Sequence, residues 1–314
     1  MSQEKSKKTL INWDLVSVNP NDKNWTWQDL FCFWGVNIQS VIGFSLITSL
    51  YIIYDLNSFV VLFGTILGTL LVLLFSNLVG KPSQKYGLPF VVLLRSSLGF
   101  KGARYFGLIR GIVGTFLFGI QTYFLSKAFS YLLRIIIFNF DKSFLNHEIF
   151  LTFYLGMNII DWIAITISIF LQAFLFSSGM NFNKKIINFS AITIYLGMLL
   201  FFFTILLSDV KFTYNVFLDI LNYENFVKKE NLEPLLTVTG TIFAYFSIVI
   251  LSFGDFSRYV KSPDALRFGN LSLLLNMIVF SLLSTTIVMD NKEKTIIFNN
   301  KLKFPNLSAS GDLT

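Results

Sequence analysis

The fold is decided by a stretch near the N-terminus that reads WQDLFCFWGVNIQSVIG over residues 27–43 and stays apolar to residue 53. Asn37, Gln39 and Ser40 interrupt this stretch in the interval between two glycines, at positions 35 and 43. A helix that crosses a bilayer here places them near its deepest point, where an amide without a partner is costly. A glycine-flanked break in a membrane helix is the usual pointer to a transport site. The stretch therefore predicts a broken membrane helix whose polar side chains have a function.

The composition of the whole chain fits the same apolar surroundings. Hydrophobic residues make up 54% and charged residues only 14% of the 314 residues, whereas a soluble domain carries about 25% charge. The 37 phenylalanines suit surfaces that face lipid. A net charge of +7 does not indicate nucleic-acid binding, because the basic residues alternate between loops instead of gathering on one helix or tail. The composition predicts an all-α polytopic membrane protein.

Seven apolar segments are long enough to cross a bilayer, which takes about 20 residues. They cover residues 28–53, 58–79, 108–133, 153–177, 187–207, 235–254 and 268–289. The intervening residues 80–107 are amphipathic and basic, which predicts a short separate helix along the cytoplasmic face.

The distribution of lysine and arginine predicts the topology. Most of them lie in the N-terminal segment and in the loops on its side, while the first outer loop, around Asp55, has none. Basic residues collect on the cytoplasmic side of a membrane. We therefore expect a cytoplasmic segment over residues 1–26, a transmembrane domain over 27–289 and a polar tail over 290–314, in the plasma membrane or a bacterial inner membrane. Residues 1–26 lack the apolar core of a signal peptide.

A block after the second segment carries a family resemblance. Residues 80–99 read GKPSQKYGLPFVVLLRSSLG, and FGIQ follows at 118–121. With Asn12 and Asp14 before it and DFSR at 255–258 after it, this block resembles the nucleobase–cation symporter-1 family, the permeases for cytosine, uracil, allantoin, hydantoins and related compounds.

The resemblance implies the first part of a five-plus-five inverted-repeat transporter fold, with the first and sixth helices broken at mid-membrane. It implies cation-coupled uptake of a nucleobase or related heterocycle by alternating access, with Na⁺ or H⁺ as the coupling ion and no other cofactor. Because the family has more helices than seven, the chain is either complete at seven or a C-terminally truncated product. We expect a monomer that binds lipid and a small heterocycle.

The resemblance assigns two glutamines to the substrate. Gln39 corresponds to the family's substrate-binding glutamine, and its amide both donates and accepts, as the N–H and C=O edges of such a ring require. Gln121 would bind the ring from the third helix. Each has a structural alternative: Gln39 would bond backbone freed at the break, and Gln121 would bond a neighbouring helix.

Two aromatic positions are implied, and one of them departs from the family. Leu117 stands where the family has tryptophan, and stacking of a base on an aromatic ring is worth about 1–3 kcal/mol. The substrate is then smaller or non-planar, or another aromatic takes over. In the sixth helix Phe246 aligns with the second stacking residue, with Tyr245 as the neighbour that could replace it. The alternative for Phe246 is a core or lipid-facing side chain.

Gly35 and Ile38 match positions whose backbone carbonyls coordinate the cation in the family, because unwound backbone exposes its oxygens. The alternative is that both residues only permit and pack the bend.

Charges within the segments need a reason because they are expensive in lipid. If the fourth helix begins near residue 153, Asp161 lies inside the membrane and takes part in proton coupling; if it begins near 160, Asp161 is interfacial, which we favour. Lys127 is placed to pair with it. The basic cluster after the second segment is expected to anchor the inner face to anionic lipid, with gating as the alternative; it comprises Arg95, Arg104 and Arg110.

Enzymatic chemistry is not indicated. The chain has no Walker loop and no Cys/His metal spacing, and its single histidine excludes a His-Glu-x-x-His protease. The classes left open are a secondary transporter and a non-transporting membrane protein. An amino-acid permease on the same scaffold is a weaker rival, since it would need a free helix terminus for a carboxylate instead of Asn37 and Gln39.

Overall fold

A computed structural model describes residues 15–52, 56–140, 152–208, 210–221 and 232–302. Every named element within these ranges is helical, and six helices are long and apolar enough to cross a membrane. With the divided first segment they account for all seven expected spans, so the prediction of an all-α polytopic membrane protein is confirmed. Asn12 and Asp14, which contribute to the family resemblance, lie outside the described residues.

The first span is broken as predicted. Helix α1 (Trp27–Ile38) ends at Gln39, and helix α2 (Val41–Ile52) begins two residues later. The hydroxyl of Ser40 accepts a hydrogen bond from the Gly43 N–H at 3.0 Å and so caps the second half. Gly43 is required here because a Cβ at this position would come within 2.5 Å of the Ile38 carbonyl oxygen. At the break, the backbone carbonyl of Ile38 therefore faces Gly43 of the second half-helix.

Helices α3 (Ser58–Tyr86) and α9 (Leu232–Ser257) have the most extensive contact of the described helix pairs. Gly64 and Gly68 of α3 lie directly against Val238 and Ile242 of α9. Small residues four apart let membrane helices approach closely, since packing and not hydrophobicity drives their association. Leu235, Val238, Ile242, Phe246 and Phe253 form the buried stripe of α9.

The expected break in the sixth helix is wrong. Helix α9 runs without interruption through Gly240 and Ala244. Glycine is tolerated inside membrane helices, and this stretch contains no proline after its first turn. Of the two breaks that the resemblance predicted, the structure thus has the one in the first span and lacks the one in the sixth helix.

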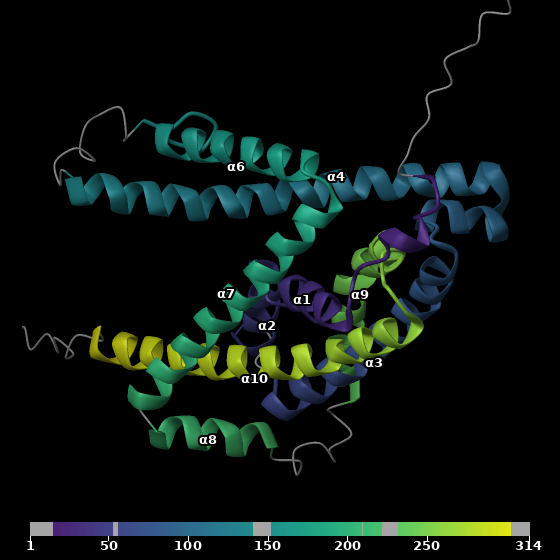
Figure 1. The fold of residues 1–314 in the computed structure, drawn as a ribbon. Helices are drawn as coiled ribbons and strands as arrows, with labels where there is room; N and C mark the ends of the chain where they lie inside the picture. Colours follow the sequence, from purple (N-terminus) through teal and green to yellow (C-terminus); the bar gives the residue numbers. More distant parts are fainter. Residues whose placement is uncertain (1–14, 53–55, 141–151, 209, 222–231, 303–314) are drawn as a thin grey trace, which may run out of the picture.

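Helix α10 (Pro263–Leu302) lies across α1 and α3 (Figure 1) and is the most buried of the six spans. It continues past the predicted end at residue 289, into the expected polar tail. Asn270, fully buried, ties these helices together: its Oδ1 accepts from Trp34 Nε1 at 3.3 Å and its Nδ2 donates to Asn77 Oδ1 at 3.0 Å.

The predicted short helix within residues 80–107 is confirmed in part: a short helical arm from Phe90 to the kink at Gly99 precedes the long arm, but residues 80–86 do not belong to it. Residues 80–86 belong to the end of α3, which is capped by Gly87 in the left-handed conformation (φ 69°). Residues from Phe90 onward belong to α4 (Phe90–Phe140), which bends sharply at Gly99 (φ 66°, ψ −179°). The first arm folds back on the second, so that a Cβ at Gly107 would meet Val91 at 3.2 Å. Two glycines with positive φ therefore bound the short helical arm: Gly87 caps α3 before it, and Gly99 makes the kink after it.

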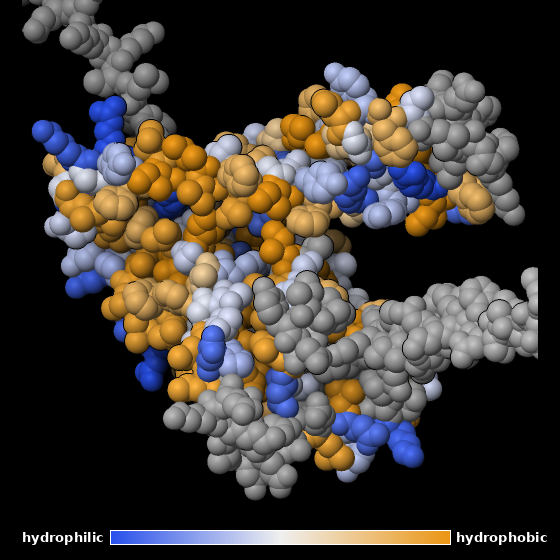
Figure 2. Space-filling view, turned by 180° about the vertical axis from the view of Figure 1, so that it is seen from behind, coloured by the Kyte–Doolittle hydropathy of each residue, from blue (hydrophilic) through white to orange (hydrophobic). Residues whose placement is uncertain are grey.

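Helix α6 (Ile159–Ser177) lies beside the long arm of α4 and is joined by a turn at Gly179 to α7 (Met180–Ser208), which crosses to α1 and α10 (Figure 1). Helix α8 (Val210–Leu221) follows α7. The outer surfaces of α4, α6 and α7 carry many exposed phenylalanines, leucines and isoleucines. Figure 2 shows large areas of hydrophobic side chains on the described surface of one face, with hydrophilic ones at its margin and on the inner side of the upper arm.

The segment before α1 is held by backbone hydrogen bonds. After a short turn of 3-10 helix, η2 (Pro20–Asp22), the N–H of Trp25 donates to the Tyr259 carbonyl at 3.0 Å and the Trp25 carbonyl accepts from Lys261 N–H at 2.9 Å. The Trp25 side chain is completely buried. Val18 N–H donates to the Gly87 carbonyl at 2.9 Å. The start of α1 is thus fastened to the α9–α10 turn and the end of α3.

Candidate functional site at the break of the first span

Gln39 lies between the two half-helices with its amide enclosed. The side chain is 7% exposed, and neither its nitrogen nor its oxygen has a hydrogen-bond partner among the described residues. The Tyr195 hydroxyl is a polar neighbour of this amide, without hydrogen-bond geometry between them. The alternative role in which Gln39 bonds freed backbone is therefore absent from the structure. An enclosed amide left unpaired costs about 1–3 kcal/mol, so it needs another explanation.

Gly35 and Ile38, the predicted cation ligands, lie in the last turn of α1, just before Gln39. The Gly35 carbonyl already accepts the Gln39 N–H at 2.9 Å. The Ile38 carbonyl faces Gly43 across the break, as described above. A cation-binding role for these carbonyls stays a prediction. At Gly35 the missing side chain leaves Asn276 Oδ1 and the Tyr195 ring each 3.2 Å from the position of a Cβ.

Tyr245, not Phe246, is the aromatic residue beside the break. Its hydroxyl lies 2.6 Å from Ser40 Oγ and 3.5 Å from the Asn37 carbonyl, to which it donates. Phe246 is 1% exposed and belongs to the α9 stripe that packs on α3. The two rings meet edge to face at 4.9 Å, which points them in different directions. The position of Phe246 thus fits the structural alternative, a core side chain, and Tyr245 is the residue of the two that lies at the break; a substrate role for either stays a prediction.

Asn276 and Tyr195 are two further polar residues near Gln39, and the sequence analysis missed both. Asn276 of α10 is fully buried, and its Nδ2 donates to the Ser272 carbonyl at 2.9 Å and the Phe31 carbonyl at 3.4 Å. Its Oδ1 accepts a hydrogen bond from the Tyr195 hydroxyl of α7. The signal was available: an asparagine in the middle of an apolar span is the same anomaly as Asn37 and Gln39.

A groove lies beside the N-terminal half of α1, between this helix, α7 and α10. It has a volume of about 870 Å³ and is lined by Trp27, Gln28, Asp29, Phe31, Cys32, Asn188, Ile192, Phe268, Ser272 and Leu275. Phe31 stacks on Tyr195, with ring centroids 5.8 Å apart and an angle of 20°. In the groove lining, Asp29 is paired, since its carboxylate accepts from Asn188 at 2.7 Å and lies 3.7 Å from Lys184 Nζ.

Gln121 and Leu117 are not brought to the break. Gln121 is exposed and Leu117 half-buried on α4, whose main neighbour is α6. The rotation of α4 has a clear cause. Thr122 is buried and donates to Gln172 Oε1 of α6 at 2.9 Å, which turns the adjacent Gln121 away by about 100° because a helix advances 3.6 residues per turn. A substrate role for Gln121 stays a prediction without support from its position.

Arg110 holds α4 to α9 instead of standing free on the surface. Its Nη2 lies 2.6 Å from Asp255 Oδ2, and its Nη1 donates to the Leu251 carbonyl at 3.2 Å. Asp255 Oδ1 accepts from the Phe90 N–H at 3.1 Å. The acidic residue of the DFSR motif thus joins both arms of the α4 hairpin to the end of α9. Arg95 and Arg104 are exposed, and their lipid-anchoring role stays a prediction.

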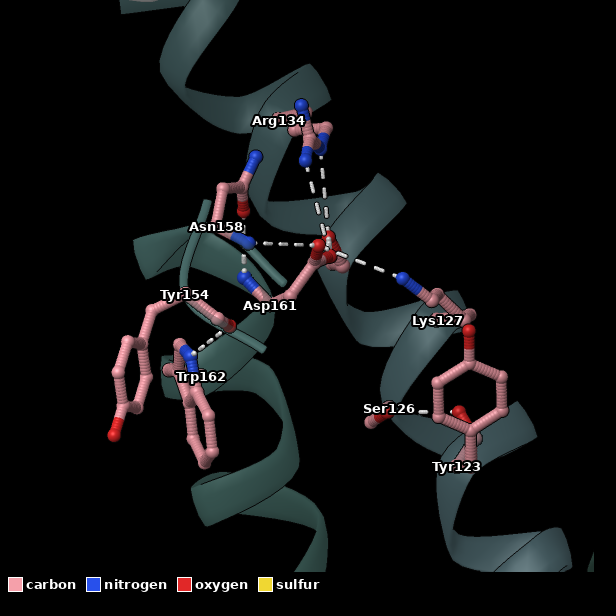
Figure 3. Close-up of polar contacts among 9 residues, drawn as sticks. Tyr123, Ser126, Lys127, Arg134, Tyr154, Asn158, Asp161 and Trp162 are labelled. Atoms are coloured by element: carbon pink, nitrogen blue, oxygen red, sulfur yellow. Dashed lines mark hydrogen bonds and ion pairs between the residues drawn. The ribbon is translucent and has the colours of Figure 1, made fainter. Parts of the chain in front are cut away.

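A charged cluster joins the far ends of α4 and α6 (Figure 3). Helix α6 begins at Ile159, which is the start that we favoured, and Asn158 and Asp161 form a capping box in its first turn. Asp161 also lies 3.4 Å from Lys127 Nζ and 3.8 Å from Arg134 Nη2, and accepts from Ser130 at 2.6 Å. The predicted Lys127–Asp161 pair is therefore present, with a second cation beside it.

We expect Asp161→Leu to destabilise the protein by about 1–3 kcal/mol, because it removes charge-assisted hydrogen bonds and leaves two half-buried cations without their carboxylate. Thermal unfolding of the detergent-solubilised chain measures this. Asp264→Leu is the matched control, an exposed aspartate in the first turn of α10. Equal melting temperatures for the two variants would show that the cluster contributes nothing.

Comparison with known proteins places this geometry in a family. The family model for permeases of cytosine/purines, uracil, thiamine and allantoin matches residues 17–295. The chain is 25% identical over 301 residues to the purine-uracil permease NCS1 of Arabidopsis thaliana, covering 95% of the chain and 47% of that protein. No solved structure matches it.

Two bacterial relatives match shorter parts. The allantoin permease of Bacillus subtilis is 32% identical over 132 residues, covering 42% of the chain and 26% of the relative. The putative allantoin permease of Escherichia coli is 29% identical over 111 residues, covering 35% and 23%. The chain thus spans less than half the length of these relatives. Because the family model covers most of it, the chain belongs to the family of permeases for cytosine/purines, uracil, thiamine and allantoin, a family of membrane transporters and not of enzymes.

Proposed function

We propose that this chain forms the substrate-binding part of a secondary transporter, which moves a nucleobase or related heterocycle of the uracil, cytosine, allantoin or hydantoin type by alternating access. The observation that carries the proposal is the enclosed, unpaired amide of Gln39 beside a broken membrane helix. An amide that donates and accepts matches the adjacent N–H and C=O groups of these rings. The relatives named for purine, uracil and allantoin transport support the same class of substrate.

The coupling ion is part of the proposal. A carbonyl turned across a helix break is a typical ligand for a transported cation, and Ile38 offers one beside Gln39. We propose Na⁺ or H⁺ as the ion, carried together with the ring, and a plasma-membrane or inner-membrane location with the N-terminus in the cytoplasm, as the distribution of basic residues favours.

Uptake and binding measurements test this function. Vesicles that contain the chain are given labelled uracil, cytosine, allantoin and hydantoin, with and without a sodium gradient and a proton gradient. We expect saturable binding of at least one ring, and uptake that falls when the coupling gradient is removed. Binding and uptake that stay at the level of empty vesicles for all four rings would contradict the proposal and favour a non-transporting membrane protein.

A further inference from the structure

A second pocket, with a volume of about 520 Å³, lies where the two arms of α4 meet beside the kink at Gly99. This volume is in the usual range for sites that hold small molecules, about 300–1,000 Å³. Part of its wall is apolar and comes from Leu15, Val91 and Ala103. Ala103 is 1% exposed, which makes it the floor of the pocket. We call this site the hairpin pocket.

Three cationic side chains line the hairpin pocket: Arg95, Lys101 and Arg104. Arg95 and Arg104 are nine residues apart and would point to opposite faces of a straight helix, because each residue turns a helix by about 100°. The kink brings them to one wall. Gly99 permits it, since a φ of 66° is a conformation that favours glycine.

These cations are not neutralised by the protein. Among the described residues, the lining contains no aspartate or glutamate, and none of the three cations forms an ion pair. Arg110, farther along α4, differs because it is paired with Asp255. Three like charges along one wall repel each other, so the hairpin pocket favours an anionic ligand.

An aromatic ring holds one of the cations in place. The Arg95 guanidinium carbon lies 5.2 Å from the centroid of the Phe100 ring, and this ring is 77% exposed. A cation–π contact of this kind orients the guanidinium plane. Its planar fork of N–H donors matches the oxygens of a phosphate group, so a phosphate is the anion that this wall suits best.

Exposed apolar side chains beside the hairpin pocket indicate that its ligand is a lipid. They lie on both arms of α4 and include Leu98, Phe100, Tyr105, Phe106 and Leu108. The distribution of basic residues predicts the cytoplasmic side for this segment. Anionic lipids are concentrated in that leaflet, and basic pockets between helices bind their headgroups. A lipid would use the cations and the apolar surface together, whereas a soluble phosphate would use only the cations.

We propose that the hairpin pocket binds the headgroup of an anionic lipid that ends in a phosphate monoester, with the acyl chains on the exposed apolar residues of α4. A phosphate monoester carries a charge of about −1.5 to −2 at pH 7 and three acceptor oxygens, which suits three cations better than a singly charged diester does. The sequence predicted a lipid anchor made of Arg95, Arg104 and Arg110. The structure instead gives a bounded site that includes Lys101 and leaves out Arg110.

Lipid binding to the purified full chain tests this site. Native mass spectrometry in detergent counts the bound lipid as dioleoylphosphatidic acid is added, and dioleoylphosphatidylglycerol is the reference because it has the same acyl chains and a single charge. We expect one phosphatidic acid per chain to bind first, with at least about fivefold higher affinity than phosphatidylglycerol. Inorganic phosphate in large excess should not displace it.

Two double variants with the same change in charge separate a bounded site from a general attraction to the membrane. Arg95→Gln with Arg104→Gln removes two cations of the hairpin pocket, and Lys81→Gln with Arg267→Gln removes two outside it. All four residues are exposed, so we expect melting temperatures without lipid close to that of the unmodified chain. The affinity for phosphatidic acid should fall at least about tenfold in the first variant and less than about twofold in the second.

Each other outcome overturns a stated part of the proposal. Equal losses of affinity in the two double variants would remove the hairpin pocket and leave only general charge attraction. Equal affinities for phosphatidic acid and phosphatidylglycerol would overturn the preference for a monoester. Displacement of the lipid by inorganic phosphate would show that the ligand is a soluble phosphate. The proposed transport function is independent of all three, because ring binding and uptake test it at Gln39.

Discussion

Replacing Gly68 by isoleucine should prevent the α3–α9 pair from forming its native contact. A Cβ at this position would lie 2.9 Å from both the Thr239 carbonyl oxygen and the Ile242 Cβ. A side chain can move aside, but a helical carbonyl cannot move without breaking its own helix. Overpacking in a well-packed core costs about 1–3 kcal/mol and sometimes more, and the Thr239 hydroxyl would also lose its 3.3 Å contact with the Gly64 carbonyl.

The yield of monodisperse protein and its melting temperature measure this effect. Gly114→Ile provides the matched control, because no atom lies within 4 Å of a Cβ at Gly114 and the residue is exposed on α4. We expect the Gly114 variant to melt like the unmodified chain and the Gly68 variant to melt several degrees lower or to aggregate. If both behave alike, α3 and α9 do not approach as closely as described.

Gln39→Leu should raise stability and abolish ligand binding together. The leucine removes an enclosed amide that has no hydrogen-bond partner among the described residues, which relieves a cost of about 1–3 kcal/mol, and the two hydrocarbon stems are of similar size. The same change removes the donor and acceptor for the ring, and affinity should fall at least tenfold, which corresponds to about 1.4 kcal/mol. Thermal unfolding and binding of the labelled rings are measured on the same preparations.

Gln121→Leu serves as the comparison because it makes the same chemical change at an exposed position. We expect neither its melting temperature nor its affinity to change much. The reverse result, with affinity lost at Gln121 and kept at Gln39, would return the site to α4. A Gln39 variant that is less stable than the original would mean that the amide has a structural partner.

The break in the first span could be predicted because its causes are local. Amides in an apolar stretch next to Gly43 are costly in a continuous helix, and the structure confirms that the helix stops at Gln39. The continuity of α9 was harder to foresee, since Gly240 is compatible with a helix and with a break. Only the packing of the α9 stripe on α3, a contact between distant parts of the chain, separates the two.

The composition of the candidate site depended on rotations that sequence does not record. The side of α4 that faces inward is set by the Thr122–Gln172 hydrogen bond and the Arg110–Asp255 pair, each between residues far apart in the sequence. The motif around Gln121 gave the residue type correctly but not its direction. Asn276, in contrast, carried a readable signal, and the rule applied to Gln39 would have found it.

The bonds at Trp25 constrain how the first span moves in any transport cycle. Because the Trp25 backbone donates to Tyr259 and accepts from Lys261, α1 and the α9–α10 turn form one mechanical unit at that end. The second half, α2, follows the non-helical residues Gln39 and Ser40 and packs on α10. A swing of α2 about these two residues would change the spacing between Ser40 and Tyr245, and it would have to carry the α2–α10 contact with it.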